Sequence, residues 1–335
     1  MRSSFVTAIN TLACLSLAAP ISGDCNWTTT LWDAIVVGSG PAGIIVADRL
    51  SAAGRKVLLL EAGGPSYGIT GGVERPAWLD NTNLSRIDVP GLYMSIFDGP
   101  TNLTCTGQTN AFGGCTVGGS SAVNAGLFFE PPASDFDTYF PEGWKHADLE
   151  PSIARLYAMQ PAAAITSQDS QFYLQSGYNV ARTWLVDNAG YSEVDINANS
   201  SEKTRVFGHP IYDYSNGQRG GPVTTYLQAA LARPNFVFQS GVRVQNIMRA
   251  RDIATGVNAT VAGVPTILRL ASTGRVILSG GALQSPSSSC SQASVIPLFL
   301  HVSRRQESCA LILPLPIGST TPPLARASLT TQTPL

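Results

Sequence analysis

Short apolar runs separated by glycine-rich turns mark the first part of the chain. Residues 34–37 (AIVV) form an apolar run that meets such a turn without a polar spacer, as buried parallel strands do. Apolar residues recur at helical spacing from Pro41 until Gly54 interrupts the pattern, and residues 57–60 (VLLL) form a second run. The pattern predicts a strand, a helix and a second strand in one βαβ unit, and therefore an α/β fold.

Later regions carry similar signals. The stretch 235–248 (NFVFQSGVRVQNIM) places alternating apolar residues on a predicted pair of strands, and 275–282 (RVILSGGA) predicts a further buried strand. Residues 140–205 hold no residue that stands out chemically. We interpret His146 and His209 as ordinary polar residues.

The start of the chain has the layout of a secretory signal peptide. Arg2 precedes an apolar run that is too short to span a bilayer, and small residues follow at 21–23, so we expect residues 1–23 to be removed and the protein to be extracellular. Asn-X-Ser/Thr sequons agree with a secretory route. They lie at Asn26, Asn83, Asn102, Asn199 and Asn258. Elsewhere no stretch is long and apolar enough for a membrane helix, and we expect no membrane partner.

Composition and charge narrow the possible partners. The 335 residues are 44% hydrophobic with a net charge of -1, and no run of Lys or Arg is long enough to track a nucleic-acid backbone. Three scattered histidines and the absence of a CxxC motif argue against a metal site. Of six cysteines, Cys14 would leave with the signal peptide, so at least one of the rest is unpaired. Cys105 and Cys115 are close enough in sequence to form a disulfide.

The βαβ unit contains a dinucleotide-binding pattern. Gly38, Gly40 and Gly43 fit the spacing GxGxxG, and Glu61 ends the second predicted strand. The first glycine allows a tight turn, the second lets the backbone approach a pyrophosphate, and the third allows close helix packing. Amides at the helix start favour phosphate, and Glu61 would accept hydrogen bonds from ribose hydroxyls, which disfavours NADP. Glycine spacing alone does not separate FAD from NAD.

A second glycine cluster lies within residues 112–137. Gly118, Gly119, Ser120 and Ser121 offer little besides backbone amides and hydroxyl groups. Ordering so many small residues costs conformational entropy, so a bound ligand that this segment wraps is one explanation. An irregular surface loop is the alternative.

The run GCTVGGSSAVN at 114–124, followed by Phe128, Pro131 and Asp137, resembles the first diagnostic motif of the glucose-methanol-choline (GMC) oxidoreductases, which use FAD. Residues 87–97 and 206–238 resemble the flavin domain of the fungal cellobiose dehydrogenases. The resemblance covers residues 33–286. It implies a Rossmann-like, glutathione-reductase-like FAD-binding domain at 24–286, with interleaved substrate-binding and lid segments at about 140–205 and an incomplete substrate-binding domain. The implied activity is oxidation of the CH–OH group of a sugar or other alcohol, with transfer of the electrons to an acceptor.

By this resemblance the two glycine-lined surfaces, near residues 38 and 118, close on the same FAD. Val244 stands where the main chain of the family meets the adenine ring, and residues 280–282 lie close to the cofactor. The predicted cofactor-binding residues are Gly38, Ser39, Gly40, Pro41, Ala42, Gly43, Glu61, Ala62, Gly114, Val117, Gly118, Ser121, Asn124, Val244, Gly281 and Ala282.

The sequence departs from the family after Pro286. The family continues with a lysine and a Ser-Gly-Ile-Gly motif, whereas residues 287–295 are SSSCSQASV. Family-like codons for Lys-Leu-Leu-Met-Gln-Ser-Gly-Ile-Gly, read one base later, encode this stretch. We therefore expect residues 287–335 to be an out-of-frame, disordered tail, and the enzyme to be inactive because the family's catalytic histidine lies in the missing part. No catalytic residue is assigned. A non-catalytic FAD-binding remnant and an NAD-binding Rossmann dehydrogenase are the alternatives.

Overall fold

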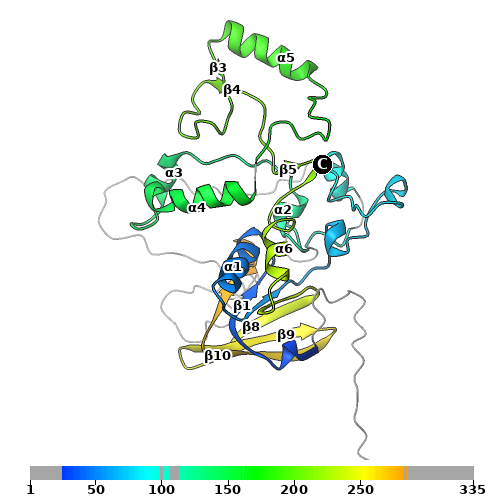
Figure 1. Cartoon of the computed structure of the whole chain (residues 1–335), viewed down its shortest axis with the longest axis vertical. Helices are drawn as coiled ribbons and strands as arrows, with labels where there is room; N and C mark the ends of the chain where they lie inside the picture. Colours follow the sequence, from blue (N-terminus) through cyan, green and yellow to red (C-terminus); the bar gives the residue numbers. More distant parts are fainter. Residues whose placement is uncertain (1–24, 99–100, 106–112, 161, 283, 286–335) are drawn as a thin grey trace, which may run out of the picture.

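The computed structural model describes residues 25–98, 101–105, 113–160, 162–282 and 284–285. The predicted signal peptide, 1–23, and the predicted out-of-frame tail, 287–335, lie outside these ranges. The described chain forms two tiers (Figure 1). The lower tier holds the main sheet with helices α1 and α6, and the upper tier holds α3, α4 and α5.

The main sheet has six strands in the order β7-β2-β1-β10-β9-β8. Neighbouring strands from β7 to β10 run parallel, whereas β10, β9 and β8 form an antiparallel meander. The strands are β1 Leu31–Val37, β2 Val57–Leu60, β7 Phe236–Gln239, β8 Val242–Ala250, β9 Ile253–Val261 and β10 Val264–Leu278. The predicted Rossmann-like α/β fold is therefore confirmed.

Alternate residues of the central strands enter two separate cores. Val36 and Leu59 pack toward helix α1 (Pro41–Ala52) and helix α6 (Tyr226–Leu231). Ile35 and Leu58 pack toward the opposite face, where residues of the meander cover them. All four side chains are inaccessible to solvent. Burial on both faces explains why the two central strands consist of continuous apolar runs.

Strand β10 belongs to both halves of the sheet. Its end, 275–278, pairs in parallel with β1, and its start, 264–269, pairs antiparallel with β9. The predicted strand at 275–282 is therefore the end of a longer strand that begins at Val264.

The predicted pair of strands within 235–248 is corrected. Both segments are strands, but β7 and β8 lie at opposite edges of the sheet and do not pair. Between them Gly241 adopts a φ of 71°, and its amide donates to the Gly63 carbonyl oxygen at 2.9 Å. The Val242 amide then donates to the Glu61 carbonyl oxygen at 2.8 Å. These bonds carry the chain past the end of β2, so the two strands diverge.

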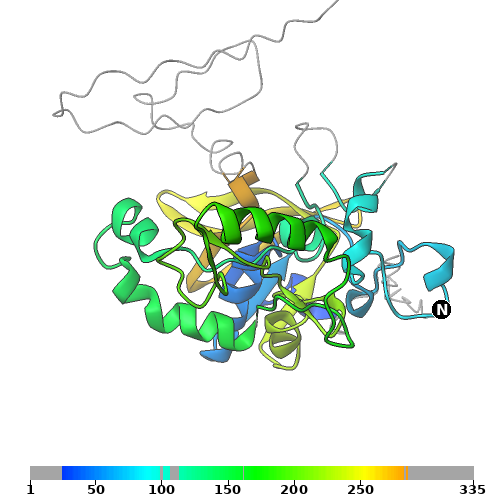
Figure 2. The ribbon, with the colours of Figure 1, turned by 90° about the horizontal axis from the view of Figure 1, so that it is seen from above.

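The remaining elements form the upper tier and the connections between the tiers. Figure 2, which looks down on the upper tier, shows α5 in front of the sheet and α4 toward the lower left of the view. The helices are η1 Cys25–Thr28, η2 Gly68–Thr70, η3 Ala77–Leu79, η4 Pro90–Phe97, α2 Ser120–Val123, α3 Ala133–Tyr139, α4 His146–Met159, α5 Ser176–Arg182 and the π-helix η5 Thr183–Asn188. Two-residue strands complete the set: β3 Ser192–Glu193, β4 Val206–Phe207, β5 Tyr214–Ser215 and β6 Gln218–Arg219. Within the described ranges, no helix combines the length and apolar character that a membrane crossing needs.

A buried polar cluster lies where the tiers meet. Arg219 is 3% exposed, and its guanidinium donates to the carbonyl oxygens of Ile87, Ser121 and Asn124 and to the Asn124 side chain, at 2.6–3.2 Å. Asp213 lies close to this cation and accepts a hydrogen bond from Gln160 Nε2 at 2.6 Å. Burial raises the pKa of Asp213 from 3.8 to about 6, although Gln160 and Arg219 oppose that shift.

This raised pKa predicts how the stability of an Asp213→Asn variant depends on pH. Folded protein binds the Asp213 proton more tightly than unfolded protein, so this carboxyl stabilises the fold below pH 4 and loses that contribution as pH rises through 6. We expect the asparagine variant to be more stable than the parent by about 1–3 kcal/mol at pH 8, with the difference shrinking toward pH 4. Urea unfolding across this range measures it, with exposed Asp252→Asn as control. A pH-independent difference would contradict the prediction.

Candidate functional site

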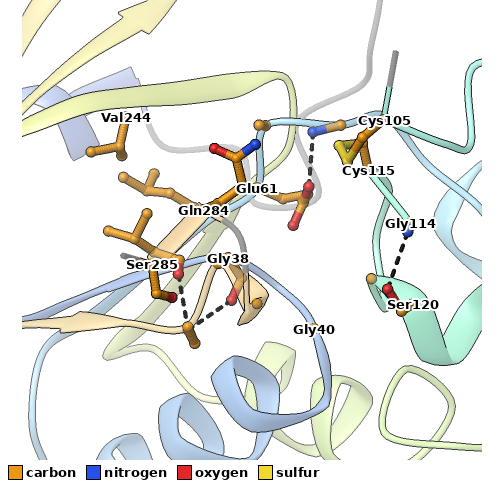
Figure 3. Close-up of a pocket in the computed structure, with 18 of the residues that line it drawn as sticks. Gly38, Gly40, Glu61, Cys105, Gly114, Cys115, Ser120, Val244, Gln284 and Ser285 are labelled. Atoms are coloured by element: carbon orange, nitrogen blue, oxygen red, sulfur yellow. Dashed lines mark hydrogen bonds between the residues drawn. A yellow bond between two sulfur atoms is a disulfide. The ribbon is translucent and has the colours of Figure 1, made fainter. Parts of the chain in front are cut away.

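A cavity of about 920 Å³ opens at the carboxyl ends of β1, β2 and β10. The start of α1, the first residues of β8 and two segments at 101–105 and 114–120 complete its lining. Figure 3 shows Val244 toward one end, the Cys105–Cys115 disulfide toward the other, Glu61 between them, and the Gly38–Gly40 turn along one side. Ligands of open α/β sheets bind at this edge, outside the carboxyl ends of the strands.

The three glycines of the first motif have different roles. Gly38 has a φ of 100°, and a Cβ there would lie 2.5 Å from the Ser279 carbonyl oxygen. At Gly43 a Cβ would lie 1.9 Å from the Gly38 carbonyl oxygen. Gly40 has an ordinary φ of -69°, and no atom lies within 4 Å of its Cβ position. The fold thus requires glycine at 38 and 43, whereas at Gly40 a side chain would only occupy free space at the cavity.

The carboxylate of Glu61 is fixed beside this turn. Its Oε2 accepts hydrogen bonds from the Ser39 amide at 2.8 Å and from Ser39 Oγ at 2.9 Å, and its Oε1 accepts one from the Gly63 amide at 2.9 Å. The residue is 7% exposed and lines the cavity. Each carboxylate oxygen accepts two hydrogen bonds, so Oε1 retains capacity for a ligand hydroxyl.

The second glycine segment lies directly against the first. The Gly118 amide donates to the Ser39 carbonyl oxygen at 2.9 Å, and the Cβ position of Gly119 is 2.9 Å from the Gly40 Cα. The Val117 amide donates to the Gly64 carbonyl oxygen at 3.0 Å. The two glycine-lined surfaces therefore meet in one cavity, although they are far apart in the sequence.

The predicted disulfide between Cys105 and Cys115 is confirmed, with a Cα–Cα distance of 4.9 Å. Both cysteines line the cavity. The Cys105 amide donates to the Gly113 carbonyl oxygen, and the Cys115 amide donates to the Leu103 carbonyl oxygen, each at 2.9 Å. The disulfide therefore fastens the wall at 101–105 to the segment that carries the second glycine cluster.

The structure separates the predicted cofactor-binding residues into two groups. Ten line the cavity: Gly38, Gly40, Pro41, Ala42, Glu61, Ala62, Gly114, Val244, Gly281 and Ala282. Six do not line it: Ser39, Gly43, Val117, Gly118, Ser121 and Asn124. In this second group Ser39 anchors Glu61, Ser121 Oγ donates to the Gly118 carbonyl oxygen at 2.7 Å, and Asn124 accepts from Arg219.

Several lining residues were not predicted as cofactor contacts. They include Cys105, Cys115, Ser120, Arg243, Gln284 and Ser285. Cys115 and Ser120 lie within the second motif, and Cys105 is the predicted disulfide partner of Cys115, so their positions were a usable signal. The contribution of Arg243, in contrast, depends on how β8 starts. Neither His146 nor His209, the histidines in the described ranges, lines the cavity. His209 is stacked between Phe172 and Tyr178 in the upper tier, with ring centroids 4.0 and 3.7 Å away.

This geometry suits an extended dinucleotide. The cavity continues from the α1 turn, whose first amides lack partners within the helix, to Glu61 and the start of β8. A pyrophosphate fits at the helix start, where the dipole favours negative charge, and an adenosine fits between Glu61 and Val244. Within the described ranges, no group of His, Cys, Asp and Glu residues could hold a metal ion.

Comparison with known proteins agrees with the geometry. The GMC oxidoreductase family profile matches residues 33–288. The chain is 30% identical over 250 residues to the oxygen-dependent choline dehydrogenase of Vibrio vulnificus. The aligned region covers 69% of this chain and 42% of that protein. It is also 30% identical over 268 residues to the chloroplastic fatty acid photodecarboxylase of Chlamydomonas reinhardtii. That alignment covers 76% of this chain and 43% of the photodecarboxylase. The chain thus spans a little under half the length of these two relatives.

Solved structures share the fold. A formate oxidase from Aspergillus oryzae matches with a TM-score of 0.59 at 19% identity, covering 77% of this chain and 47% of the oxidase. An FAD-dependent oxidoreductase from Chaetomium thermophilum matches with a TM-score of 0.59 at 17% identity, covering 76% of this chain and 46% of the oxidoreductase. The family match, the cavity and the two joined glycine segments lead to one conclusion: the chain belongs to the GMC oxidoreductases, a family of FAD-dependent enzymes.

Proposed function

We propose that this chain holds the FAD of an oxidoreductase that acts on the CH–OH group of a sugar, in the manner of the cellobiose dehydrogenases. The observation that carries the proposal is Gly40. Its backbone conformation suits any residue and its Cβ would meet nothing, so the open space in front of it is the reason for a glycine. That space lies at the start of α1, where a pyrophosphate would bind.

Sequence resemblance supports the sugar substrate. Names of the relatives point to different substrates, including choline and a fatty acid, so family membership alone does not choose among them. Residues 87–97 and 206–238 resemble cellobiose dehydrogenases. The two stretches meet through Arg219, which donates to the Ile87 carbonyl oxygen.

We also propose that the 335-residue chain binds FAD without oxidising the sugar. Bound flavin supplies the hydride acceptor, and the reaction also needs a base to take the hydroxyl proton. No imidazole from the described residues lines the cavity. In this proposal the chain is a cofactor-binding unit.

Export through the secretory pathway is part of the proposal. The Cys105–Cys115 disulfide supports it, because disulfides persist in oxidising compartments. Four of the five sequon asparagines are exposed, and the fifth, Asn258, is half-buried in β9.

Gly40 and Gly43 should respond differently to substitution. Gly40→Val would fill the cavity where the pyrophosphate binds, so we expect loss of FAD binding with little change in the stability of the FAD-free protein. Gly43→Ala would force Cβ into the Gly38 carbonyl oxygen, and overpacking of this kind costs about 1–3 kcal/mol. FAD titration and urea unfolding of the FAD-free proteins measure the two effects. Normal FAD affinity in Gly40→Val would refute the assigned pyrophosphate position.

Removal of the disulfide should loosen the cofactor wall. For the double variant Cys105→Ser, Cys115→Ser we expect a loss of roughly 2–3 kcal/mol in stability, because a short closed loop restricts the unfolded chain. FAD should also bind about tenfold more weakly, equivalent to roughly 1.4 kcal/mol. Cys25→Ser, which leaves the disulfide intact, is the matched control. If stability falls while FAD affinity is unchanged, the disulfide does not shape the site.

The sugar and cofactor proposals are tested with two proteins. One is the 335-residue chain, and the other is expressed from a gene whose reading frame is restored after Pro286. We expect both to show flavin absorbance, and the restored protein alone to reduce a dye when cellobiose is added. Nicotinamide binding without flavin would refute the cofactor. Reduction with choline but not cellobiose would refute the sugar, and turnover by the 335-residue chain would refute the claim that it is a binding unit.

A further inference from the structure

A second concave surface lies between α1, α4 and α6, with a volume of about 570 Å³. Figure 1 shows α4 above α1, and α6 beside α1. This α1–α4–α6 groove shares no lining residue with the cofactor cavity. Part of its lining is apolar, from Ile45, Leu156 and Met159.

The charges of the groove are unbalanced. Arg49, Arg155 and Arg233 line it together with one carboxylate, that of Asp48, which leaves a net charge of +2. Asp48 is 3% exposed and forms an ion pair with Arg233 at 2.7 Å. Neither Arg49 nor Arg155 has a carboxylate within 4.0 Å among the described residues. Arg155 donates to Ser152 Oγ at 2.7 Å, so its guanidinium retains further donors.

Tyr226 adds a neutral donor to the same lining. It is 6% exposed, and no described residue accepts a hydrogen bond from its hydroxyl. Burial, followed by the nearby charge of Asp48, raises its pKa, so the hydroxyl keeps its proton at neutral pH. The hydroxyl is not fully enclosed, so at the groove it can donate to water or to a ligand oxygen.

We propose that the α1–α4–α6 groove binds an amphipathic organic anion. The acidic group, a carboxylate or a phosphate, faces Arg49, Arg155 and the Tyr226 hydroxyl, and the apolar body lies against Ile45 and Leu156. The volume falls within the range of small-molecule sites, and a concave surface with two unpaired cations is too limited for a nucleic-acid backbone. This site is separate from the proposed cofactor site and does not depend on it.

Calorimetric titration of the full chain tests the proposal. The probes are octanoate and octyl phosphate, which distinguish the two acidic groups, and octanol, which lacks a charge. We expect at least one anion to bind more than tenfold more tightly than octanol. Arg155→Ala and Arg49→Ala should each weaken that binding about five- to tenfold, as expected for loss of a charge-assisted hydrogen bond at a partly exposed site. Arg155→Lys should retain part of the affinity.

Arg249→Ala is the matched control, because it removes an exposed arginine from β8, which contributes no residue to the groove. Equal affinity for octanol and the anions would overturn the proposal, as would equal effects of Arg155→Ala and Arg249→Ala. Absence of anion binding at millimolar concentration would also overturn it. FAD absorbance and thermal unfolding are followed for each variant and should match the parent. Because the groove is titrated separately, loss of the FAD site would leave this result interpretable.

Discussion

The site depends on how closely backbone segments approach each other. A Cβ on Gly43 would lie 1.9 Å from the Gly38 carbonyl oxygen, and a Cβ on Gly63 would lie 1.8 Å from the Cys115 carbonyl oxygen. No side chain fits at such separations, so these contacts exist only between glycine and main chain. They bring the start of α1, the end of β2 and the second glycine segment together, and the cavity is the space that these backbones enclose.

The two glycine motifs therefore contain two kinds of residue, those that line the cavity and those that do not. Some present their backbone or carboxylate to the cavity, as Gly40 and Glu61 do. Others, such as Asn124, do not line the cavity and instead form hydrogen bonds within the fold. Asn124 accepts from the guanidinium of Arg219, a buried cation whose hydrogen bonds join Ile87 to the segment that carries Ser121 and Asn124. Loss of one partner would leave a buried charge partly unsatisfied, which explains why a motif near a cofactor includes residues that need not touch it.

Local patterns predicted the βαβ unit, because strand, turn and helix signals are all encoded within a short stretch around Gly38. The disulfide followed from spacing and the expected compartment. The separation of β7 from β8 could not be predicted, because β7 pairs with β2, which is remote in sequence, while β8 pairs with β9, which follows it. The sequence also could not show which motif residues line the cavity, because 114–124 is largely irregular and its side chains follow no fixed period. The arginines of the groove come from α1, α4 and the end of α6, and only the tertiary fold brings them together.

The double membership of β10 has a consequence for synthesis of the protein. Strand β1 pairs with β10 on one side, yet β2 ends at Leu60 and β10 begins at Val264. At the usual rate of translation, roughly ten to forty seconds pass between the synthesis of β2 and the synthesis of β10. During that interval one edge of the nascent β1 lacks its partner, and its apolar residues stay open to unwanted association. Chaperone contact early in translation would therefore matter more for this chain than for one whose neighbouring strands are also consecutive.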